Sequence, residues 1–264
     1  MADASYLKRF FDGGPEEAAG CLRCRGSEDY VDELLMAFQP IVDVDAREVY
    51  GYEALVRGAD GRSAAAVLAG VAEAQRYGFD QTCRVLAIET ATRLGIRCRL
   101  SINFLPNAVY EPATCIRLTL AAAKRVGFPA SNLIFEMAES EKIRDPDHAL
   151  AIVRDYQHRG FLTAIDDFGA GWSGLNLLVD FQPQIVKLDM ALVRDIDRHK
   201  VRQAIVGGVL DTCAALGIAV VAEGIETRAE LDHLRARGVR LFQGFLLAEP
   251  AINRLPEPDW NAID

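Results

Sequence analysis

Oxygen-bearing side chains lie near the ends of apolar runs along this sequence, a pattern expected of ligands for a hard metal ion. Glu53, Asn103 and Glu136 each stand near the end of one such run, and Asp166 and Asp167 end another. Several carboxylates that converge on one point repel each other unless cations neutralise them. Oxygen-only ligands suit Mg²⁺ or Mn²⁺, whereas zinc usually recruits His or Cys. The sequence therefore predicts a magnesium or manganese site.

The adjacent pair Asp166–Asp167 indicates that this site holds two metal ions. Successive side chains of an extended strand face opposite sides, so both carboxylates cannot point the same way within the strand. The second must reach back from the start of the following loop. Two metals about 4 Å apart can polarise a phosphate and activate a bridging water. The alternative is that the pair forms a polar strand end or a helix cap.

Lys187 lies inside the apolar run Ile185–Asp189, where an unpaired lysine would be costly. There it could orient an attacking water or neutralise the negative charge that develops on a phosphorane. The alternative is a plain salt bridge to Asp189 or Glu223. The Gly-rich stretch 167–174 follows a strand-like run and suits a mobile working loop, although it matches neither the P-loop nor the dinucleotide-binding pattern.

The elements that would position these residues are eight short β-rich runs with helical segments between them. Most of the runs are nearly continuous in apolar residues, as expected of parallel strands covered on both faces. Residues 80–94 and 201–216 have helical periodicity. The runs are Phe38–Val42, Val49–Leu55, Arg99–Asn103, Leu133–Met137, Leu162–Asp166, Ile185–Asp189, Ala219–Glu223 and Leu241–Phe245.

This pattern predicts an α/β fold, a TIM-like (β/α)8 barrel whose strand ends form one functional face. Only Asp43–Glu48 separates the first two runs, and a parallel crossover needs a dozen residues or more. The first two strands are therefore expected to form an antiparallel hairpin. Residues 56–98 would hold two helices before the third strand. Glu223 and Gln243 would join the polar residues at the rim.

Composition excludes several other classes of function. The chain has 264 residues and a net charge of −9, which argues against binding to polymeric nucleic acid or to anionic membrane. No apolar run is long enough to insert into a bilayer, and no signal peptide is evident, so a cytoplasmic protein is expected. Cys21 and Cys24 have the spacing of half a zinc site or a redox pair, but no second such pair follows.

Three segments are expected on this basis. Residues 1–33 would be a short N-terminal extension, residues 34–255 the barrel, and residues 256–264 a C-terminal tail.

Together these motifs make the chain resemble the EAL-domain phosphodiesterases that hydrolyse cyclic di-GMP. The likeness covers about residues 34–252, and its motifs occur in the family's order. They are Phe38-Gln-Pro40, Tyr52-Glu-Ala-Leu-Val-Arg57, Ser101-Ile-Asn103, Phe135-Glu-Met-Ala-Glu139, Ile165-Asp-Asp-Phe-Gly-Ala-Gly171, Ile185-Val-Lys-Leu-Asp189, Ala222-Glu-Gly-Ile-Glu-Thr227 and Gln243-Gly-Phe245.

The resemblance implies hydrolysis of cyclic di-GMP to linear pGpG with two Mg²⁺ or Mn²⁺ ions, and little support from Ca²⁺. Glu53, Asn103, Glu136 and Asp166 would bind the first metal, and Asp166 would bridge to a second metal held partly by Asp167. Lys187 would position the nucleophilic water beside Glu223. The catalytic group would then comprise Lys187, Glu223, Glu53 and Asp166.

The resemblance also implies roles for residues around the metals. Glu139 would steady the 167–174 loop, which the family ties to dimerisation, so a homodimer is expected. The helix over Gly174–Phe181 is more apolar than one buried face requires, which suits either ordinary packing or such a dimer contact. The expected substrate contacts are Gln39, Leu55, Arg57 and Gln243.

Three positions depart from the family pattern, and none is a proposed metal ligand. Trp172 stands where Tyr is common, Ala138 replaces the Thr before Glu139, and Glu249 occupies a position where a basic residue is common. Two other functions stay open. The chain could be a catalytically silent receptor for cyclic di-GMP that acts through partner binding, or a different metal-dependent barrel enzyme.

Overall fold

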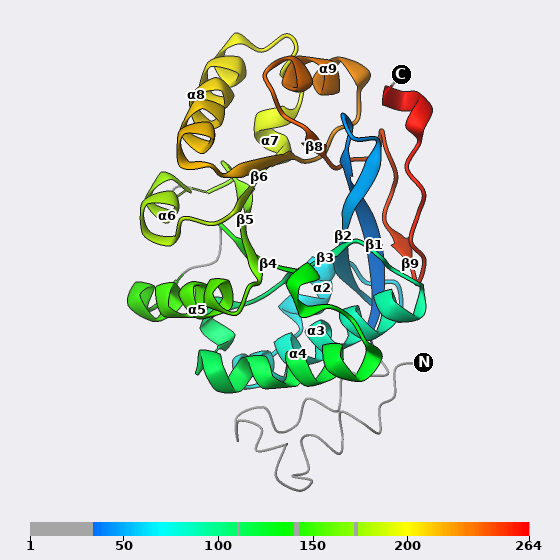
Figure 1. Cartoon of the computed structure of the whole chain (residues 1–264), viewed down its shortest axis with the longest axis vertical. Coiled ribbons are helices and arrows are strands. Elements are labelled where there is room, and N and C mark those ends of the chain that lie inside the picture. The colour runs from blue at the N-terminus through cyan, green and yellow to red at the C-terminus, as the bar shows by residue number, and fades with distance from the viewer. Residues whose placement is uncertain (1–33, 110, 140–142, 172–173, 264) are drawn as a thin grey trace, which may run out of the picture.

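The chain folds into a closed barrel of strands surrounded by helices (Figure 1). The computed structural model describes residues 34–109, 111–139, 143–171 and 174–263. The strand order is β2-β3-β4-β5-β6-β7-β8-β1-β9, and a further pairing of β2 with β1 closes the barrel. The predicted (β/α)8-type barrel is therefore confirmed. Residues 1–33, including Cys21 and Cys24, lie outside the described residues.

Each of the eight predicted strands is present, with shifted ends. A short ninth strand, β9, pairs with β1. The bounds are β1 (Leu34–Asp43), β2 (Glu48–Gly58), β3 (Arg99–Asn103), β4 (Leu133–Ala138), β5 (Leu162–Phe168), β6 (Ile185–Leu188), β7 (Ala219–Ala222), β8 (Leu241–Phe242) and β9 (Ala251–Ile252).

The predicted hairpin is confirmed, because β1 pairs with β2 in antiparallel register. From β2 to β8 every neighbouring pair is parallel. Strand β8 is shorter than the predicted Leu241–Phe245 because the chain turns there against Ile225. A Cβ on Gly244 would lie 2.1 Å from the Ile225 carbonyl oxygen, so only glycine fits this approach.

Helices and short 3₁₀ turns connect the strands, and local signals set several of their ends. Pro112 and Pro146 lie in the first turns of α4 and α5, and the left-handed Gly127 and Gly217 end α4 and α8. The helices are α2 (Ala64–Ala69), α3 (Arg76–Arg93), α4 (Pro112–Val126), α5 (Pro146–His158), α6 (Gly174–Phe181), α7 (Met190–Val193), α8 (Lys200–Leu216) and α9 (Arg228–Ala236), and the 3₁₀ turns are η3 (Glu73–Gln75), η4 (Pro106–Ala108), η5 (Ala130–Asn132) and η6 (Trp260–Ile263).

The barrel interior changes from apolar to charged along the strands. Side chains two residues apart share a strand face. Ile134 therefore faces the interior below Glu136, and Ile185 faces it below Lys187. This alternation fills one end of the barrel with buried apolar side chains and places charged side chains at the other end. The buried apolar side chains are those of Ile41, Ile134, Ala164, Ile185, Val221 and Leu241.

The last described segment packs back onto the barrel. Ile263 is buried, and Trp260 packs against the main core. Tyr52 Oη donates a hydrogen bond to the Pro256 carbonyl oxygen at 3.1 Å. None of the described helices combines the length and the apolar character needed to cross a membrane.

Candidate functional site

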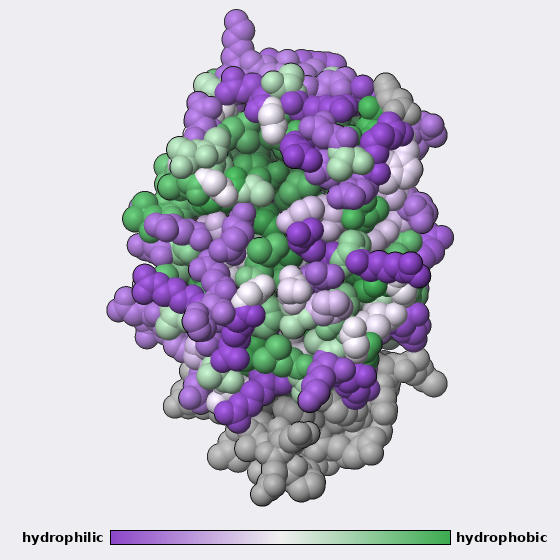
Figure 2. Space-filling model, in the orientation of Figure 1, coloured by the Kyte–Doolittle hydropathy of each residue, from purple (hydrophilic) through white to green (hydrophobic). Residues whose placement is uncertain are grey.

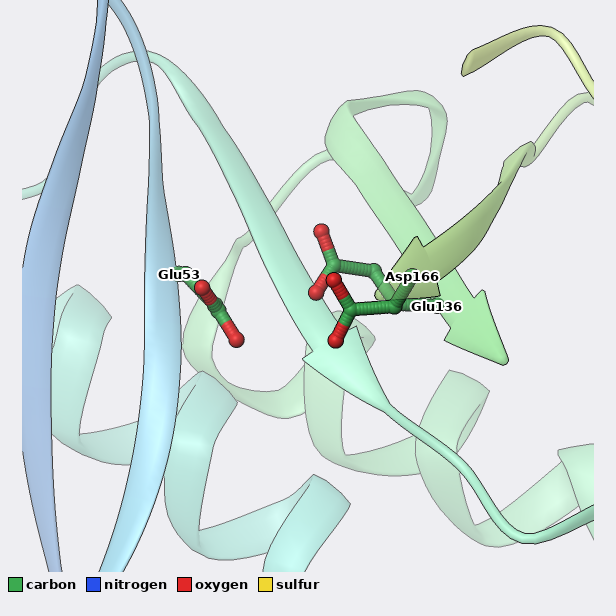
Figure 3. A group of neighbouring side chains, drawn as sticks. All are labelled: Glu53, Glu136 and Asp166. Atoms are coloured by element: carbon green, nitrogen blue, oxygen red, sulfur yellow. The ribbon is translucent and has the colours of Figure 1, made fainter. Parts of the chain in front are cut away.

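Three buried carboxylates from different strands point toward one another at the rim of the barrel (Figure 3). Glu53 comes from β2, Glu136 from β4 and Asp166 from β5. Each offers a carboxylate oxygen that lies within 4.8 Å of the others. Ligands at this spacing can surround one small cation, so the structure brings together three of the predicted first-metal ligands.

A second acidic group shares Asp166 with the first. It contains Asp166, Asp167 and Glu223, whose carboxylate oxygens again lie within 4.8 Å of one another. Asp167 adopts a left-handed backbone conformation with φ of 53°, and the β5–β6 register is irregular between Ile165 and Phe168. This local turn lets the second carboxylate reach back to the rim, as the sequence predicts.

Asn103 lies at the rim beside the first group. It ends β3 opposite Glu136 in the parallel register with β4. Its Nδ2 donates a hydrogen bond to Glu53 Oε1 at 3.0 Å, and the residue is exposed to solvent. The amide is thus close enough to Glu53 to serve the same cation through its oxygen.

Lys187 is a fully buried cation at the centre of these carboxylates. Its side chain is 1% exposed, and its ammonium group is close to carboxylates from β2, β4, β5 and the end of β7. Asp189, one of the two partners considered from the sequence, instead caps α7 by accepting a hydrogen bond from the Ala191 amide. The distances from Lys187 Nζ are 3.2 Å to Glu53 Oε2, 3.0 Å to Glu136 Oε2, 2.8 Å to Asp166 Oδ1 and 2.7 Å to Glu223 Oε1.

Burial and mutual repulsion shift the proton affinities of this cluster. Burial raises the pKa of Glu136 and of Glu223 well above their ordinary values, although Lys187 partly offsets the effect. Burial and the charges of Asp166 and Asp189 raise the pKa of Asp167 to about 6. Burial alone would lower the pKa of Lys187, but the surrounding carboxylates hold it well above its ordinary value.

These residues fit divalent cations. The two acidic groups contain five carboxylates, whereas among the described residues the ammonium group of Lys187 is the one cationic partner they share. Asp166 Oδ1 is buried and accepts no hydrogen bond from the described residues, although Lys187 Nζ lies 2.8 Å away. Excess negative charge and hard oxygen donors are the conditions under which Mg²⁺ or Mn²⁺ binds.

Two glutamine side chains, linked to each other by a hydrogen bond, hold the carboxylate of Glu53 in place. Gln243 Nε2 donates to Glu53 Oε2 at 2.7 Å and to Gln39 Oε1 at 3.1 Å. Gln39 Nε2 in turn donates to the Ala248 carbonyl oxygen at 3.0 Å. The two glutamines predicted as substrate contacts therefore also fix the orientation of a metal-ligand candidate.

Ser101 is a site residue to which the sequence reasoning gave no role. Its Oγ donates a short 2.5 Å hydrogen bond to Glu136 Oε1, and the serine is completely buried. The signal that could have found it is strand periodicity, because Ser101 lies two residues before Asn103 and shares its face.

Glu139 holds the start and end of the Gly-rich loop. Its carboxylate accepts hydrogen bonds from the amides of Gly169 at 2.6 Å, Gly171 at 3.3 Å and Gly174 at 2.7 Å. Gly169 has φ of +99°, a conformation that side-chain-bearing residues rarely adopt. The predicted contact between Glu139 and this loop is therefore present, and Trp172 and Ser173 lie outside the described residues.

A cavity of about 600 Å³ opens over the acidic groups. Gln39, Leu55 and Gln243 line it, together with the exposed Phe245. Arg57 is not part of the wall, and its Nη1 donates to the neighbouring Val56 carbonyl oxygen at 2.8 Å. Of the departures from the family pattern, Ala138 lines the cavity and the exposed Glu249 does not.

Comparison with known proteins identifies the family. The EAL domain profile matches residues 30–250, so the chain belongs to the EAL domain family. A solved standalone EAL protein from Vibrio cholerae O395, in its c-di-GMP-bound form, is 51% identical with a TM-score of 0.84 and covers 88% of this chain and 98% of its own. The manganese and cy-diGMP complex of Klebsiella pneumoniae BlrP1 is 38% identical with a TM-score of 0.79, covering 86% of this chain and 58% of its own.

Two curated relatives carry different descriptions. The blue light- and temperature-regulated antirepressor BluF of Escherichia coli K12 is 30% identical over 250 residues, which cover 94% of this chain and 61% of the relative. The cyclic di-GMP phosphodiesterase PA2567 of Pseudomonas aeruginosa is 30% identical over 233 residues, covering 85% of this chain and 39% of the relative. The chain therefore spans less than two thirds of either relative.

Proposed function

We propose that this protein hydrolyses cyclic di-GMP to linear pGpG by attack of a metal-activated water. The observation that carries the proposal is that Asp166 belongs to both acidic groups at the rim. A carboxylate shared in this way suits a position between two divalent cations. The resemblance to cyclic di-GMP phosphodiesterases supplies the substrate.

Each side chain of the cluster has a role that its position supports. Glu53, Asn103, Glu136 and Asp166 would hold one cation, and Asp166 with Asp167 would hold the other. When bound, the two Mg²⁺ or Mn²⁺ ions polarise a phosphate and lower the pKa of a water. That water would attack the phosphate among the side chains of the proposed catalytic group, which are Lys187, Glu223, Glu53 and Asp166.

Lys187 and Glu223 act on the attacking water and on the phosphate. Lys187 Nζ lies 2.7 Å from Glu223 Oε1, so the two side chains form one fixed unit. The ammonium group of Lys187 can donate a hydrogen bond to the attacking water and so orient the lone pair of that water toward phosphorus. The same positive charge stabilises the negative charge that grows on the phosphoryl oxygens.

The cavity gives the substrate its place. A volume of about 600 Å³ lies within the range of small-molecule sites, and its wall combines apolar side chains with the acidic rim. Gln39, Leu55 and Gln243 line this cavity and would touch the dinucleotide. Arg57 would reach a phosphate by leaving its contact with the Val56 carbonyl oxygen.

We further propose a homodimer formed through α6. Leu177, Leu178 and Phe181 of this helix are buried, whereas Leu175 and Val179 are 64% and 72% exposed. Figure 2 shows hydrophobic surface on the left of the molecule, the side on which Figure 1 places α6. Because α6 begins at Gly174, whose amide Glu139 binds, a contact at this helix would act on the loop that carries Asp167.

A second function is favoured by the similarity to an antirepressor. In this alternative the chain binds cyclic di-GMP without cleaving it and acts through a partner. The intact acidic cluster with Lys187 argues for catalysis, because binding alone does not require a buried lysine held among four carboxylates.

One assay separates these functions. Turnover is measured by incubating the purified chain with cyclic di-GMP and Mn²⁺, and binding is measured by calorimetry with the Asp166→Asn variant. Binding with turnover to pGpG supports the proposal, and binding without turnover supports the receptor. Absence of both binding and turnover supports a different barrel enzyme.

A further inference from the structure

Arg84 is a charged side chain in the protein core, far from the surface where arginine normally lies. It belongs to α3 and has no exposed area. Its Nη2 lies 2.7 Å from Asp80 Oδ2, one turn earlier on the same helix. Its Nη1 donates a hydrogen bond to Tyr156 Oη of α5 at 2.7 Å. The buried guanidinium group therefore links α3 to α5.

Three aromatic rings surround the guanidinium group. Its Cζ lies 5.4 Å from the ring centre of Phe135, 5.6 Å from that of Phe104 and 5.9 Å from that of Tyr156. Phe104 and Phe135 meet edge to face, with ring centres 6.2 Å apart, and Phe135 and Tyr156 lie 4.7 Å apart. Cation–π attraction of this kind is stronger when both groups are removed from water, as they are here.

The two phenylalanines are chain neighbours of metal-ligand candidates. Phe104 directly follows Asn103, and Phe135 directly precedes Glu136. The Phe104 amide also donates to the Glu136 carbonyl oxygen at 2.9 Å. The ends of β3 and β4 carry Asn103 and Glu136 on one face. On the other face, Phe104 and Phe135 pack against the guanidinium group of Arg84.

Asp80 adds a backbone contact to this arrangement. Its Oδ1 accepts a hydrogen bond from the Leu105 amide at 3.0 Å, just beyond the end of β3. The ion pair with Arg84 therefore fixes both the main chain after Asn103 and the rings next to Asn103 and Glu136. Three elements, α3, α5 and the β3–β4 edge, meet at one guanidinium group.

We propose that Arg84 is a positioning residue for the metal site, setting the relative placement of Asn103 and Glu136 from behind the sheet. A well-packed apolar side chain of similar volume often replaces a buried ion pair without loss of stability, so stability alone does not account for a charge here. An apolar side chain has no directional bonds with which to join α3, α5 and the strand ends. The inference rests on the proposed metal site and deepens it.

The test compares Mn²⁺ binding by folded variants, without substrate. The double variant Asp80→Asn/Arg84→Met removes both charges together, so that no buried charge is left unpaired, and the side-chain oxygen of the new amide can still accept from the Leu105 amide. The control Leu231→Ala opens a cavity of its own in α9, on the opposite side of the barrel from α3 (Figure 1). Circular dichroism establishes that each variant is folded at the temperature of the calorimetric titration.

The double variant should bind Mn²⁺ at least tenfold more weakly than the parent chain, whereas Leu231→Ala should stay within twofold. The Mn²⁺ concentration that gives half-maximal phosphodiester hydrolysis should rise by a similar factor. If the folded double variant binds Mn²⁺ within twofold of the parent, the positioning role is overturned. A parent chain that binds no Mn²⁺ would instead overturn the proposed metal site itself.

Tyr156→Phe decides the question if the double variant does not fold. It removes the hydroxyl that accepts from Arg84 and retains the ring, so the core stays filled. A loss of Mn²⁺ affinity of twofold to fivefold supports the positioning role, and an affinity equal to the parent's overturns it.

Discussion

Asp166 lies 2.8 Å from the ammonium group of Lys187, and its carboxylate belongs to both acidic groups at the rim of the barrel. The pair joins β5 to β6 at the centre of the site. A single lysine cannot neutralise the carboxylates of both groups, so the arrangement favours additional cations beside it.

Replacing Asp166 with Asn should reduce turnover of cyclic di-GMP to below about 1% of the parent rate. The amide keeps the shape of the side chain but loses the charge that two cations would share. Steady-state hydrolysis with saturating Mn²⁺ measures the effect. The matched control is Asp211→Asn, which changes an exposed aspartate of α8 and should leave the rate unaltered. Substantial activity in Asp166→Asn would exclude a bridging role.

Lys187→Ala should lower kcat about 10²- to 10³-fold while leaving KM within a few fold of the parent value. The reason is that the ammonium group acts on charge that develops during attack, and such an interaction is made mainly in the transition state. Lys200→Ala, which removes an exposed lysine of α8, is the control. A rise in KM with an unchanged kcat would make Lys187 a substrate-binding residue instead.

Metal substitution tests the geometry of the site. Removing divalent cations with a chelator should abolish hydrolysis, and Mg²⁺ or Mn²⁺ should restore it. Ca²⁺ should bind but support little turnover, because its longer bonds and loose coordination misplace the attacking water. Rates measured at saturating concentrations of each ion provide the comparison. Equal rates with Ca²⁺ and Mg²⁺ would argue against a tightly spaced pair of cations.

Val179→Asp should split the proposed dimer and lower both activity and Mn²⁺ affinity. The charge would fall on the exposed side of α6, next to the loop that Glu139 binds. Analytical ultracentrifugation and the hydrolysis assay measure the two effects across the same concentrations. The control Ile252→Asp places the same charge on an exposed apolar residue of β9. A parent chain that is monomeric and fully active would show that this coupling does not exist.

Glu230 offers a prediction about stability that is independent of catalysis. Burial alone would raise the pKa of its carboxyl, but hydrogen bonds from the backbone amides of Asp195, Glu226 and Thr227 lower it below the ordinary value of 4.5. A carboxyl with a lowered pKa in the folded state stabilises the fold above the unfolded-state pKa. This contribution is lost as the pH falls through the folded-state pKa.

Glu230→Gln should therefore reduce the free energy of unfolding by about 1–2 kcal/mol at pH 7, and by less at pH 3.5. Urea titrations of the parent chain and the variant at the two pH values give the difference directly. A difference of the same size at both pH values would mean that the carboxylate charge is not what stabilises the start of α9.

The sequence was sufficient to predict the barrel, the β1–β2 hairpin and the rim residues, because each depends on local patterns. The short linker Asp43–Glu48 excludes a parallel crossover, and polar residues after apolar runs mark the strand ends. Strand periodicity also predicted that the Asp167 side chain turns back toward the rim. In the structure a left-handed backbone conformation at Asp167, with φ of 53°, produces this turn.

Contacts between distant side chains could not be predicted in this way. Gln243 and Glu53 lie 190 positions apart in the chain, and only the closed barrel brings them together. The burial of Arg84 is hidden for the same reason, because an arginine on a helix normally indicates a solvent-facing position. Arg57 shows the converse, since its motif indicates a substrate contact while its side chain bonds to its own neighbour.

Hydrolysis by a metal-activated water is tested by a reaction of cyclic di-GMP with the purified chain and Mn²⁺ in ¹⁸O-labelled water, followed by mass spectrometry. Attack of water on phosphorus breaks the bond to the 3′ oxygen. We expect linear pGpG with one ¹⁸O in its 5′-phosphate, formed by the parent chain and not by Asp166→Asn. Intact cyclic di-GMP after prolonged incubation, under conditions where calorimetry shows it to be bound, would show that the protein is not a phosphodiesterase for this substrate.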